Sequence, residues 1–263
     1  MSKRPAPALA KLTRPRLHNV VARDRLFRML DKSRERACVW VAGPPGAGKT
    51  TLVASYLNAC NASAVWYQID TGDSDPATFF YYLREAVFAQ SQRQAKRLPL
   101  FTPEYRSDLS GFSRRFFRGV FGALGPQSLL IFDNFHELSD QSSLHPALAA
   151  CLEEVPESAN LLIVSRADPP SAFARALIGN LIAKIDWEDL RLTRSETMAI
   201  ALARGISLHK EIDTLHEESS GWMAGVVLMA ERLLHTGDLR KVGRSEPLET
   251  RRGEPRTRAR ARQ

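Results

Sequence analysis

The chain lacks the features that would place it in a membrane or among disulfide-rich secreted proteins. No apolar run approaches the roughly 18 residues that a membrane-spanning helix needs. The N-terminus is basic, but no apolar segment follows it, which argues against secretion. Only three cysteines occur, Cys38, Cys60 and Cys151, and their wide spacing fits neither a disulfide framework nor a metal site. We expect them to be small core residues of a cytoplasmic protein, with an organelle transit peptide as the alternative for the Arg-rich start.

Acidic residues are scarce at both ends of the chain. Residues 1–36 carry eleven Lys or Arg against three acids, and residues 239–263 carry nine against three. Residues 37–238 hold 17 basic and 23 acidic side chains, although the whole chain has a net charge of +8. The basic character therefore belongs to the ends, which weakens the case for a folded nucleic-acid-binding surface.

One stretch carries a specific chemical signal. The residues that match G-x-x-x-x-G-K-[ST] are Gly43, Pro44, Pro45, Gly46, Ala47, Gly48, Lys49 and Thr50, and Thr51 follows them. An apolar run over 37–42 precedes the motif and is typical of a buried strand, and residues 51–60 follow with helical spacing. The motif therefore predicts a phosphate site at a helix N-terminus, with glycines that let the backbone amides approach. In it Lys49 would reach the β- and γ-phosphates, and Thr50 would bind Mg²⁺.

The rest of the chain predicts an α/β fold followed by helices. Strand-like runs occur at 37–42, 64–69, 128–132, 161–164 and 181–185. Amphipathic segments separate them, so we expect a P-loop NTPase with a five-stranded, mainly parallel sheet covered by helices. From Thr193 onward only helical patterns occur, which predicts a small helical domain. The expected domains are a basic N-terminal segment (1–22), a nucleotide-binding domain (23–188), a helical lid (189–236) and a basic tail expected to be disordered (237–263).

Two helices of the predicted sheet domain can be described in more detail. Ser74-Asp75-Pro76 is typical of a helix start, and the buried face would be Phe79, Tyr82, Leu83 and Val87. A polar loop or frayed end is expected over 90–97. The apolar residues at helical spacing in the next segment are Phe112, Phe116, Phe117, Val120, Phe121 and Leu124. They predict an ordinary helix core, with base stacking as the alternative.

Further candidate residues follow the predicted strands. Asp133 ends the run 129–132, where a carboxylate at the end of a neighbouring strand can bind Mg²⁺. The next residue, Asn134, can accept a hydrogen bond but cannot take a proton. Glu137 could polarise the attacking water instead, or it is a solvated charge at a helix start. Arg166 follows the run 161–164 with one residue between and could contact the γ-phosphate, or it is a plain surface arginine.

An ordered set of short motifs resembles the MalT-type regulators, which belong to the STAND class (signal-transduction ATPases with numerous domains) and to the LuxR-type regulators. The stretches that carry the resemblance are 11–12, 15–17, 23–26, 43–51, 65–66, 70, 75–76, 130–136, 165–166, 169–170, 189–193, 196 and 221–225. The resemblance covers roughly residues 11–234 and stops at the nucleotide-binding region.

The resemblance implies an ATP switch that is ADP-bound at rest and ATP-bound and oligomeric when activated. It assigns phosphate and Mg²⁺ binding to Lys49, Thr50 and Asp133, and γ-phosphate sensing to Arg166. It also implies that residues 20–23 lie by the adenine and that the turn at 221–222 closes on the nucleotide.

This chain departs from the family pattern at two positions. Asn134 stands where the family usually has a second Asp, which calls hydrolysis into question. Met223 stands where the family usually has Pro, which calls nucleotide-dependent closure of the lid into question. The family continues into a winged helix, a helical-repeat sensor and a helix-turn-helix, none of which we expect in this sequence.

We therefore expect an ATP/ADP-binding switch module with slow ATP hydrolysis at most. One alternative is an active ATPase that uses Glu137 or an incoming Arg from a neighbouring molecule. Another is a nucleotide-binding protein whose tail binds nucleic acid non-specifically. The expected partners are nucleotide and, in the ATP-bound form, other copies of the chain. We expect no sequence-specific DNA-binding domain and no membrane contact.

Overall fold

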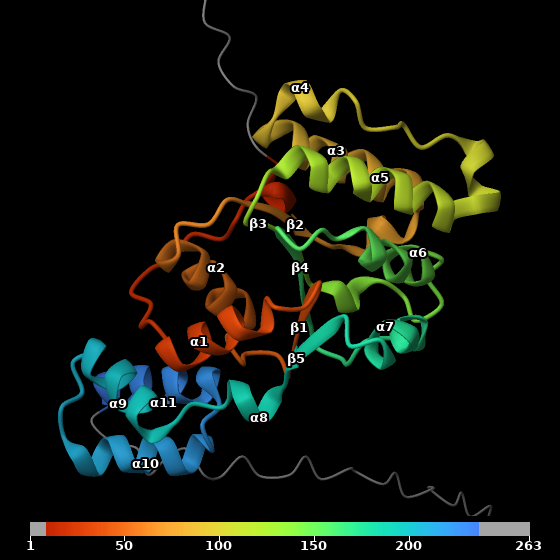
Figure 1. Cartoon of the computed structure of the whole chain (residues 1–263). Coiled ribbons are helices and arrows are strands. Elements are labelled where there is room, and N and C mark those ends of the chain that lie inside the picture. The colour runs from red at the N-terminus through yellow and green to blue at the C-terminus, as the bar shows by residue number, and fades with distance from the viewer. Residues whose placement is uncertain (1–8, 237–263) are drawn as a thin grey trace, which may run out of the picture.

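The computed structural model describes residues 9–236, which form a five-stranded sheet with helices on both faces and a helical group beside it (Figure 1). The strands are β1 (Cys38–Ala42), β2 (Ala64–Gln68), β3 (Ser128–Asp133), β4 (Ala159–Ser165) and β5 (Ile182–Ile185). The α-helices are α1 (Asp24–Ser33), α2 (Lys49–Ala59), α3 (Pro76–Gln90), α4 (Gln92–Ala95), α5 (Leu109–Leu124), α6 (Leu144–Cys151), α7 (Ala174–Ile178), α8 (Trp187–Leu190), α9 (Arg194–Ala203), α10 (His209–Ser219) and α11 (Met223–Thr236). Short 3₁₀ turns lie at Ala10–Leu12, Thr71–Ser74, Pro103–Asp108, Phe135–Glu137, Leu152–Glu154 and Ser171–Phe173. The predicted basic tail lies outside the described residues.

The sheet is parallel throughout, in the order β2-β3-β4-β1-β5. The predicted fold class is thereby confirmed. One expectation was wrong, because the strand that ends at Asp133 is not next to the strand that leads into the motif. Strand β4 lies between them, and its Leu161 is paired with Cys38 of β1 on one side and with Leu130 of β3 on the other. The carboxyl end of β4 therefore lies between the loop and Asp133.

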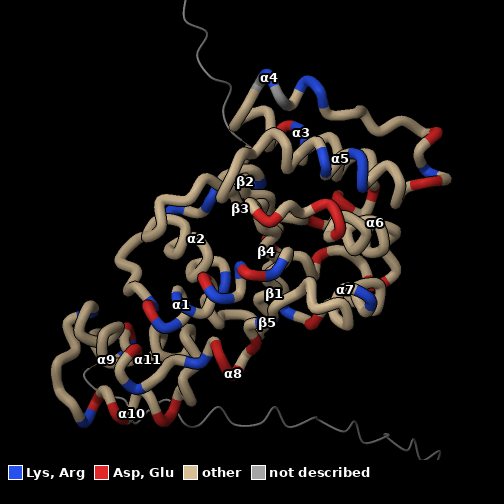
Figure 2. Tube along the Cα trace, viewed as in Figure 1, with Lys and Arg blue, Asp and Glu red and all other residues tan. Residues whose placement is uncertain are grey.

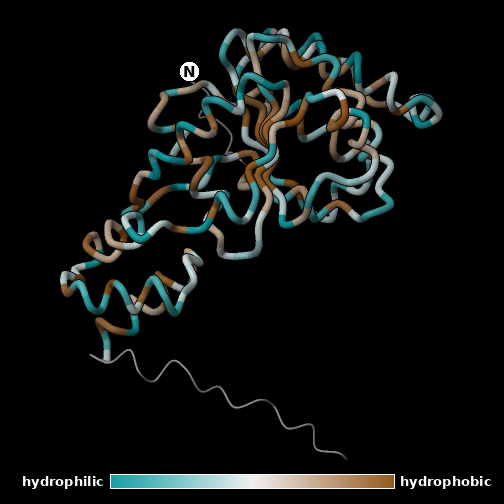
Figure 3. The backbone as a smooth tube through the Cα atoms, turned by 60° about the horizontal axis from the view of Figure 1, so that its bottom comes forward, coloured by the Kyte–Doolittle hydropathy of each residue, from teal (hydrophilic) through white to brown (hydrophobic). Residues whose placement is uncertain are grey.

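The alternation of side chains along each strand divides the core into two layers. In β1, Trp40 packs on one face with α3, α5, α6 and α7, while Val39 and Val41 pack on the other face with α1 and α2. Figure 3 shows the strands as the most hydrophobic part of the molecule. Each fully buried Leu, Val or Phe contributes about 1.5–3 kcal/mol of transfer free energy, so both layers are needed to hold the sheet.

Aromatic rings fill the layer between α3 and α5. The Phe80 ring centroid lies 4.8 Å from that of Phe112 and 5.0 Å from that of Phe116, and all three side chains are buried. This confirms the interpretation of the α5 aromatics as a helix core, and base stacking by these rings is ruled out by their burial. In α3, however, Phe80 is buried and Tyr82 only half-buried. Tyr82 still packs on the core, so the predicted face missed only Phe80, which is buried because α5 covers α3 on that side.

Two smaller expectations also need correction. Cys60 is exposed, because α2 ends at Ala59 and the chain turns away from the core there. Cys38 and Cys151 are buried as expected, and burial raises the pKa of both thiols. The segment 90–97 contains the short helix α4, in which the Ala95 amide donates to Ser91 O at 3.0 Å.

Helices α9, α10 and α11 pack around a small core of their own. Its buried members are Ala201, Ile206, Ile212, Leu215, Met229, Ala230 and Leu233. Helix α9 begins with a capping box, in which Thr193 accepts from the Glu196 amide and Glu196 accepts from the Thr193 amide. Within residues 9–236, no helix combines the length and apolarity that crossing a membrane requires.

Candidate phosphate-binding site

The motif forms the loop between β1 and α2, at the carboxyl end of the sheet. The loop starts beside β4, where the Gly43 amide donates to Ser165 O at 3.4 Å. Gly46 and Gly48 have φ angles of 73° and 81°, a conformation that side chains with a Cβ rarely adopt. The tight turn brings the chain to Lys49 and Thr50, the first two residues of α2. The N-terminal amides of α2 thus follow directly on the loop.

Lys49 binds the first two carbonyl groups of the loop. Its Nζ donates to Gly43 O at 2.5 Å and to Pro44 O at 2.9 Å. The side chain is 8% exposed, and this burial lowers the pKa of Lys49. The positive charge of Arg166 lowers it further, whereas the charge of Asp133 raises it. A buried ammonium group at this place is a ready partner for phosphate oxygens.

Trp222 and the first turn of α11 bind the next two carbonyl groups. Trp222 Nε1 donates to Pro45 O at 3.0 Å, and the Ala224 amide donates to Gly46 O at 3.0 Å. A Cβ on Gly46 would lie only 2.6 Å from the Cβ of Ala224, so glycine at this position also permits the approach of α11. The resemblance implied that the turn at 221–222 closes on the nucleotide, and the structure places Trp222 against the loop itself.

Thr50 and Asp133 meet at the carboxyl end of the sheet. Thr50 Oγ1 donates to the two carboxylate oxygens of Asp133 at 3.0 and 3.1 Å, and the Asn134 amide donates to Oδ1 at 3.0 Å. Burial raises the pKa of Asp133, whose side chain is 2% exposed, and the hydrogen bond from Thr50 opposes the rise. A hydroxyl and a buried carboxylate in contact fit Mg²⁺, which takes few protein ligands and completes its shell with phosphate oxygens and water.

The remaining predicted residues lie around this centre in different ways. Arg166 follows β4 and is exposed, yet close enough for its charge to lower the pKa of both Lys49 and His136. Glu137 does not contact Lys49, Thr50 or Asp133; its Oε1 lies 3.4 Å from His136 Nε2, an ion pair only when the histidine is protonated. Thr51 lies in the first turn of α2 and is half-buried. The structure therefore brings together Lys49, Thr50, Asp133 and Arg166 and leaves Glu137 at the side.

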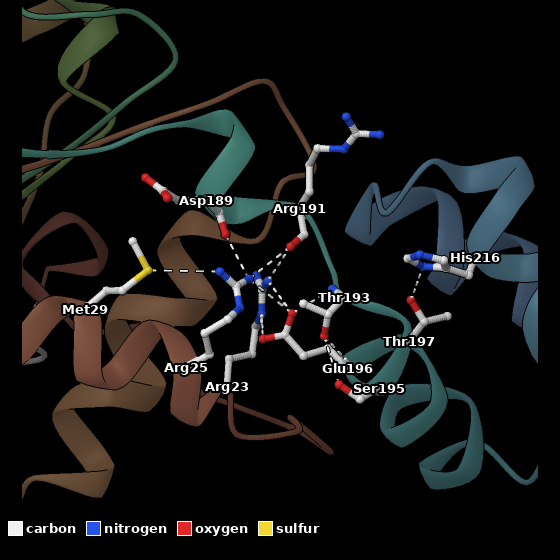
Figure 4. Close-up of polar contacts among 10 residues, drawn as sticks. All are labelled: Arg23, Arg25, Met29, Asp189, Arg191, Thr193, Ser195, Glu196, Thr197 and His216. Carbon is white, nitrogen blue, oxygen red and sulfur yellow. Dashed lines mark hydrogen bonds and ion pairs between the residues drawn. The ribbon is translucent and has the colours of Figure 1, made fainter.

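The role of Glu196 was missed from the sequence. Figure 4 shows the guanidinium groups of Arg23 and Arg25 both bound to its carboxylate, with Oε2 at 3.0 and 3.2 Å from their Nη2 atoms. Both arginines also donate to Arg191 O, at 3.2 and 3.0 Å. Arg23, which the resemblance placed near the adenine, is 4% exposed and held by this cluster. The capping-box spacing from Thr193 to Glu196 was the available signal, but it reports only the local cap.

The chain resembles proteins of known class over most of its length. The transcriptional regulator MalT of Vibrio cholerae is 28% identical over 231 residues, and that of Serratia proteamaculans is 30% identical over 225 residues. These matches cover 86% and 84% of this chain but 25% of each relative, so the chain spans about a quarter of the length of these regulators.

Two solved structures share the fold. A STAND protein with a tetratricopeptide repeat sensor from Pyrococcus horikoshii superposes with a TM-score of 0.62 at 17% identity, covering 89% of this chain and 32% of that one. A Walker-type ATPase of Pyrococcus abyssi gives 0.53 at 14% identity, covering 84% and 69%. The family model described as "AAA ATPase domain" matches residues 20–164, from the segment before α1 to the end of β4. With its phosphate loop, its buried carboxylate and more than half of its length matched, the chain belongs to the AAA ATPase domain family.

Proposed function

We propose that the chain is an ATP/ADP-binding switch module that hydrolyses ATP slowly at most. The observation that carries the proposal is the meeting of Lys49, Thr50 and Asp133 at the carboxyl end of a parallel sheet, where ligands of α/β proteins bind. A buried ammonium group, a helix N-terminus and a Mg²⁺-type donor pair together suit a nucleoside di- or triphosphate.

Each residue of this group has a separate task in the proposal. Lys49 would exchange its carbonyl partners for β- and γ-phosphate oxygens, because its ammonium group already lies inside the loop. Thr50 and Asp133 would hold Mg²⁺, which neutralises phosphate charge when bound. Arg166, exposed and near Lys49, would contact the γ-phosphate and so distinguish ATP from ADP.

Slow hydrolysis is proposed from the residue after Asp133. Asn134 cannot take a proton from an attacking water. The Glu137 carboxylate lies beside His136, 3.4 Å from its Nε2, and the hydroxyl of Thr50 binds Asp133 and not Glu137. An arginine from a neighbouring molecule could speed the reaction. Steady-state phosphate release can be compared between the wild type and Lys49→Ala. Equal rates would show that the site does not hydrolyse ATP.

The binding proposal is tested by calorimetry with Mg-ATP and Mg-ADP. Lys49→Ala removes the charge-assisted contacts to phosphate and should weaken binding about ten- to a hundredfold. Lys32→Ala, which removes an exposed lysine of α1, is the matched control and should bind as the wild type does. A folded wild-type chain that binds neither nucleotide would refute the proposal, and an unchanged affinity in Lys49→Ala would refute the assignment of the loop.

The role of the whole protein is proposed by analogy with its relatives. MalT is described as a transcriptional regulator, and the shared region covers a quarter of it. We infer that this module serves transcription regulation in the cytoplasm and self-associates when ATP is bound. Sedimentation of the chain with Mg-ATP and with Mg-ADP tests this, since equal mass in both would contradict a nucleotide-driven assembly.

A second candidate function rests on the charge of residues 239–263, which carry nine Lys or Arg against three acids. Figure 2 shows acidic and basic residues mixed along the trace of the described elements, so the tail is the stronger candidate for non-specific nucleic-acid binding. Deletion of 239–263 should abolish DNA binding that falls steeply between two salt concentrations. Binding that survives the deletion would exclude the tail.

A further inference from the structure

The first turn of α11 and the phosphate loop satisfy each other's backbone groups. Helix α11 begins after Trp222, whose carbonyl accepts the first helical bond from Val226 at 3.0 Å. The early amides of a helix have no partner within it. One of them, from Ala224, donates to Gly46 O, so the loop supplies part of the N-terminal cap of α11.

The contact also fixes how the loop amides point. In a trans peptide the C=O and N–H groups point in opposite directions. With Pro45 O held by the Trp222 indole and Gly46 O by the Ala224 amide, the amides of Gly46 and Ala47 must face away from α11. The Ala47 amide accordingly lies inside the loop, where it donates to Pro44 O at 3.3 Å.

The loop carbonyls are thus divided among three partners. Those of Gly43 and Pro44 bind Lys49, that of Pro45 binds the Trp222 indole, and that of Gly46 binds the Ala224 amide of α11. The close approach at Gly46 leaves no space between the two parts. A loop set in this way has its amides preorganised for phosphate oxygens.

The position of α11 is in turn held by a second set of contacts. Gly221 lies against the backbone of Leu192, whose amide donates to Gly221 O at 2.9 Å. The preceding carbonyl, Arg191 O, is the acceptor for both Arg23 and Arg25 (Figure 4). Direct contacts therefore run from the segment before α1, through residues 191–192 and 221, to the phosphate loop.

We propose that Trp222 and the first turn of α11 are positioning elements of the phosphate site, so that polyphosphate binding and docking of α11 are coupled. The inference rests on the proposed nucleotide binding and adds the residues that set the loop. Coupling of this kind is reciprocal: if α11 favours bound polyphosphate, bound polyphosphate tightens the docking of α11 by the same factor.

The test compares three variants of the full chain by calorimetry with Mg-ADP and with Mg-pyrophosphate. Trp222→Phe keeps the ring but removes the N–H donor, and should weaken both ligands about three- to tenfold. Ala224→Leu places a larger side chain against Gly46 while leaving the loop sequence intact, and should weaken them more. Leu228→Ala, at a 60% exposed position of the same helix, is the control and should bind as the wild type does.

A second readout separates positioning from a general loss of structure. Hydrogen exchange at the Ala224 amide should slow when Mg-ADP is added to the wild type, and slow less in Trp222→Phe. The coupling alone would be overturned if Mg-ADP left the exchange rate of the Ala224 amide unchanged. It would also be overturned if the wild type bound normally and both Trp222→Phe and Ala224→Leu kept its affinity. A folded wild type that fails to bind Mg-ADP would overturn the proposed function and the coupling with it.

Discussion

Asp133 is a carboxylate kept nearly free of solvent, with a threonine hydroxyl and a backbone amide as its hydrogen-bond donors. Burial raises its pKa above the ordinary value, so the native state holds the proton more tightly than the unfolded state does. Stability contributed by this group therefore falls as the pH rises from the unfolded pKa, about 3.9, through the raised native pKa. Burial therefore disfavours the ionised carboxylate in the native state, and Mg²⁺ binding would offset this penalty.

Asp133→Asn should accordingly stabilise the protein when no Mg²⁺ is present. We expect a gain on the order of 1 kcal/mol at pH 7, or a rise in Tm of about 2–4 °C for a chain of this size. The same variant should lose the stabilisation that Mg-ADP gives the wild type. Thermal unfolding with and without Mg-ADP measures both effects, and Glu157→Gln at an exposed carboxylate is the control. A lower Tm for Asp133→Asn without Mg²⁺ would contradict the account.

Asn134 combines an unusual backbone with a side chain that cannot act as a base. Its φ of 59° lies in the left-handed region that Asn and Asp tolerate best. Asn134→Asp should therefore fold normally and raise phosphate release, by up to about a hundredfold if proton acceptance limits hydrolysis. Asn180→Asp, at another asparagine with positive φ, is the matched control. An unchanged rate despite normal nucleotide binding would place the limit elsewhere.

At the scale of elements, Glu196 joins two parts of the chain that lie far apart in sequence. It closes the capping box of α9 and binds the arginines at the start of α1. Burial raises the pKa of Glu196, but hydrogen bonds from Arg23, the Thr193 amide and Arg25 outweigh it, so the net pKa is lowered. Its contribution to stability is present above the unfolded pKa, about 4.3, and is lost as the pH falls from there through the lower native pKa.

Glu196→Gln should lower the free energy of unfolding by about 3 kcal/mol at pH 7, because Arg23 is left buried without its counter-charge. The variant should also lose part of the wild-type decline in stability between about pH 5 and pH 3. Urea unfolding over this pH range measures both effects. Glu218→Gln, at an exposed position of α10, should leave the curve unchanged. Parallel pH curves for Glu196→Gln and the wild type would refute the ionic role.

The elements that could be predicted are those whose signal is local. Apolar runs indicate the five strands. Asp75 before Pro76 indicates the start of α3, and the structure shows Asp75 as the N-cap of that helix. A place for β4 beside β3 is expected for such a fold, but its pairing with β1 could not be predicted, since strand order depends on contacts between distant segments. The exposure of Cys60 was missed for a similar reason, because helical spacing does not show where a helix ends.

The residues of the candidate site likewise differ in whether a local sequence pattern indicates them. Lys49, Thr50 and Asp133 follow from motif and strand ends, and the structure brings them together. The resemblance implied that the turn at 221–222 closes on the nucleotide. No local pattern indicates the hydrogen bonds of Trp222 and Ala224 to the loop itself, since about 180 residues of chain separate the partners. The assignment of Lys49, Thr50 and Asp133 to nucleotide and metal stays a prediction until binding is measured.

At the scale of the whole molecule, the helical group α9–α11 lies beside α1 and α8 (Figure 1). The predicted boundary between residues 188 and 189 falls within α8, whose own capping box links Asp186 to Asp189. The division into a nucleotide-binding domain and a lid remains a proposal. The contacts across it are partly apolar, since Val21 packs on Leu192, Ile200 and Val226, and partly hydrogen bonds. Arg23, Arg25, Trp222 and Ala224 supply them from both sides.

The bond from Ala224 to Gly46 has a practical consequence for anyone who shortens this chain. A fragment that stops at the end of the sheet would leave two loop carbonyls facing water and free to rotate. Such a fragment would keep every residue of the G-x-x-x-x-G-K-[ST] motif and still present it in many conformations. The smallest piece in which the motif has a defined shape therefore extends through α11, beyond what the motif or the family match at 20–164 would suggest.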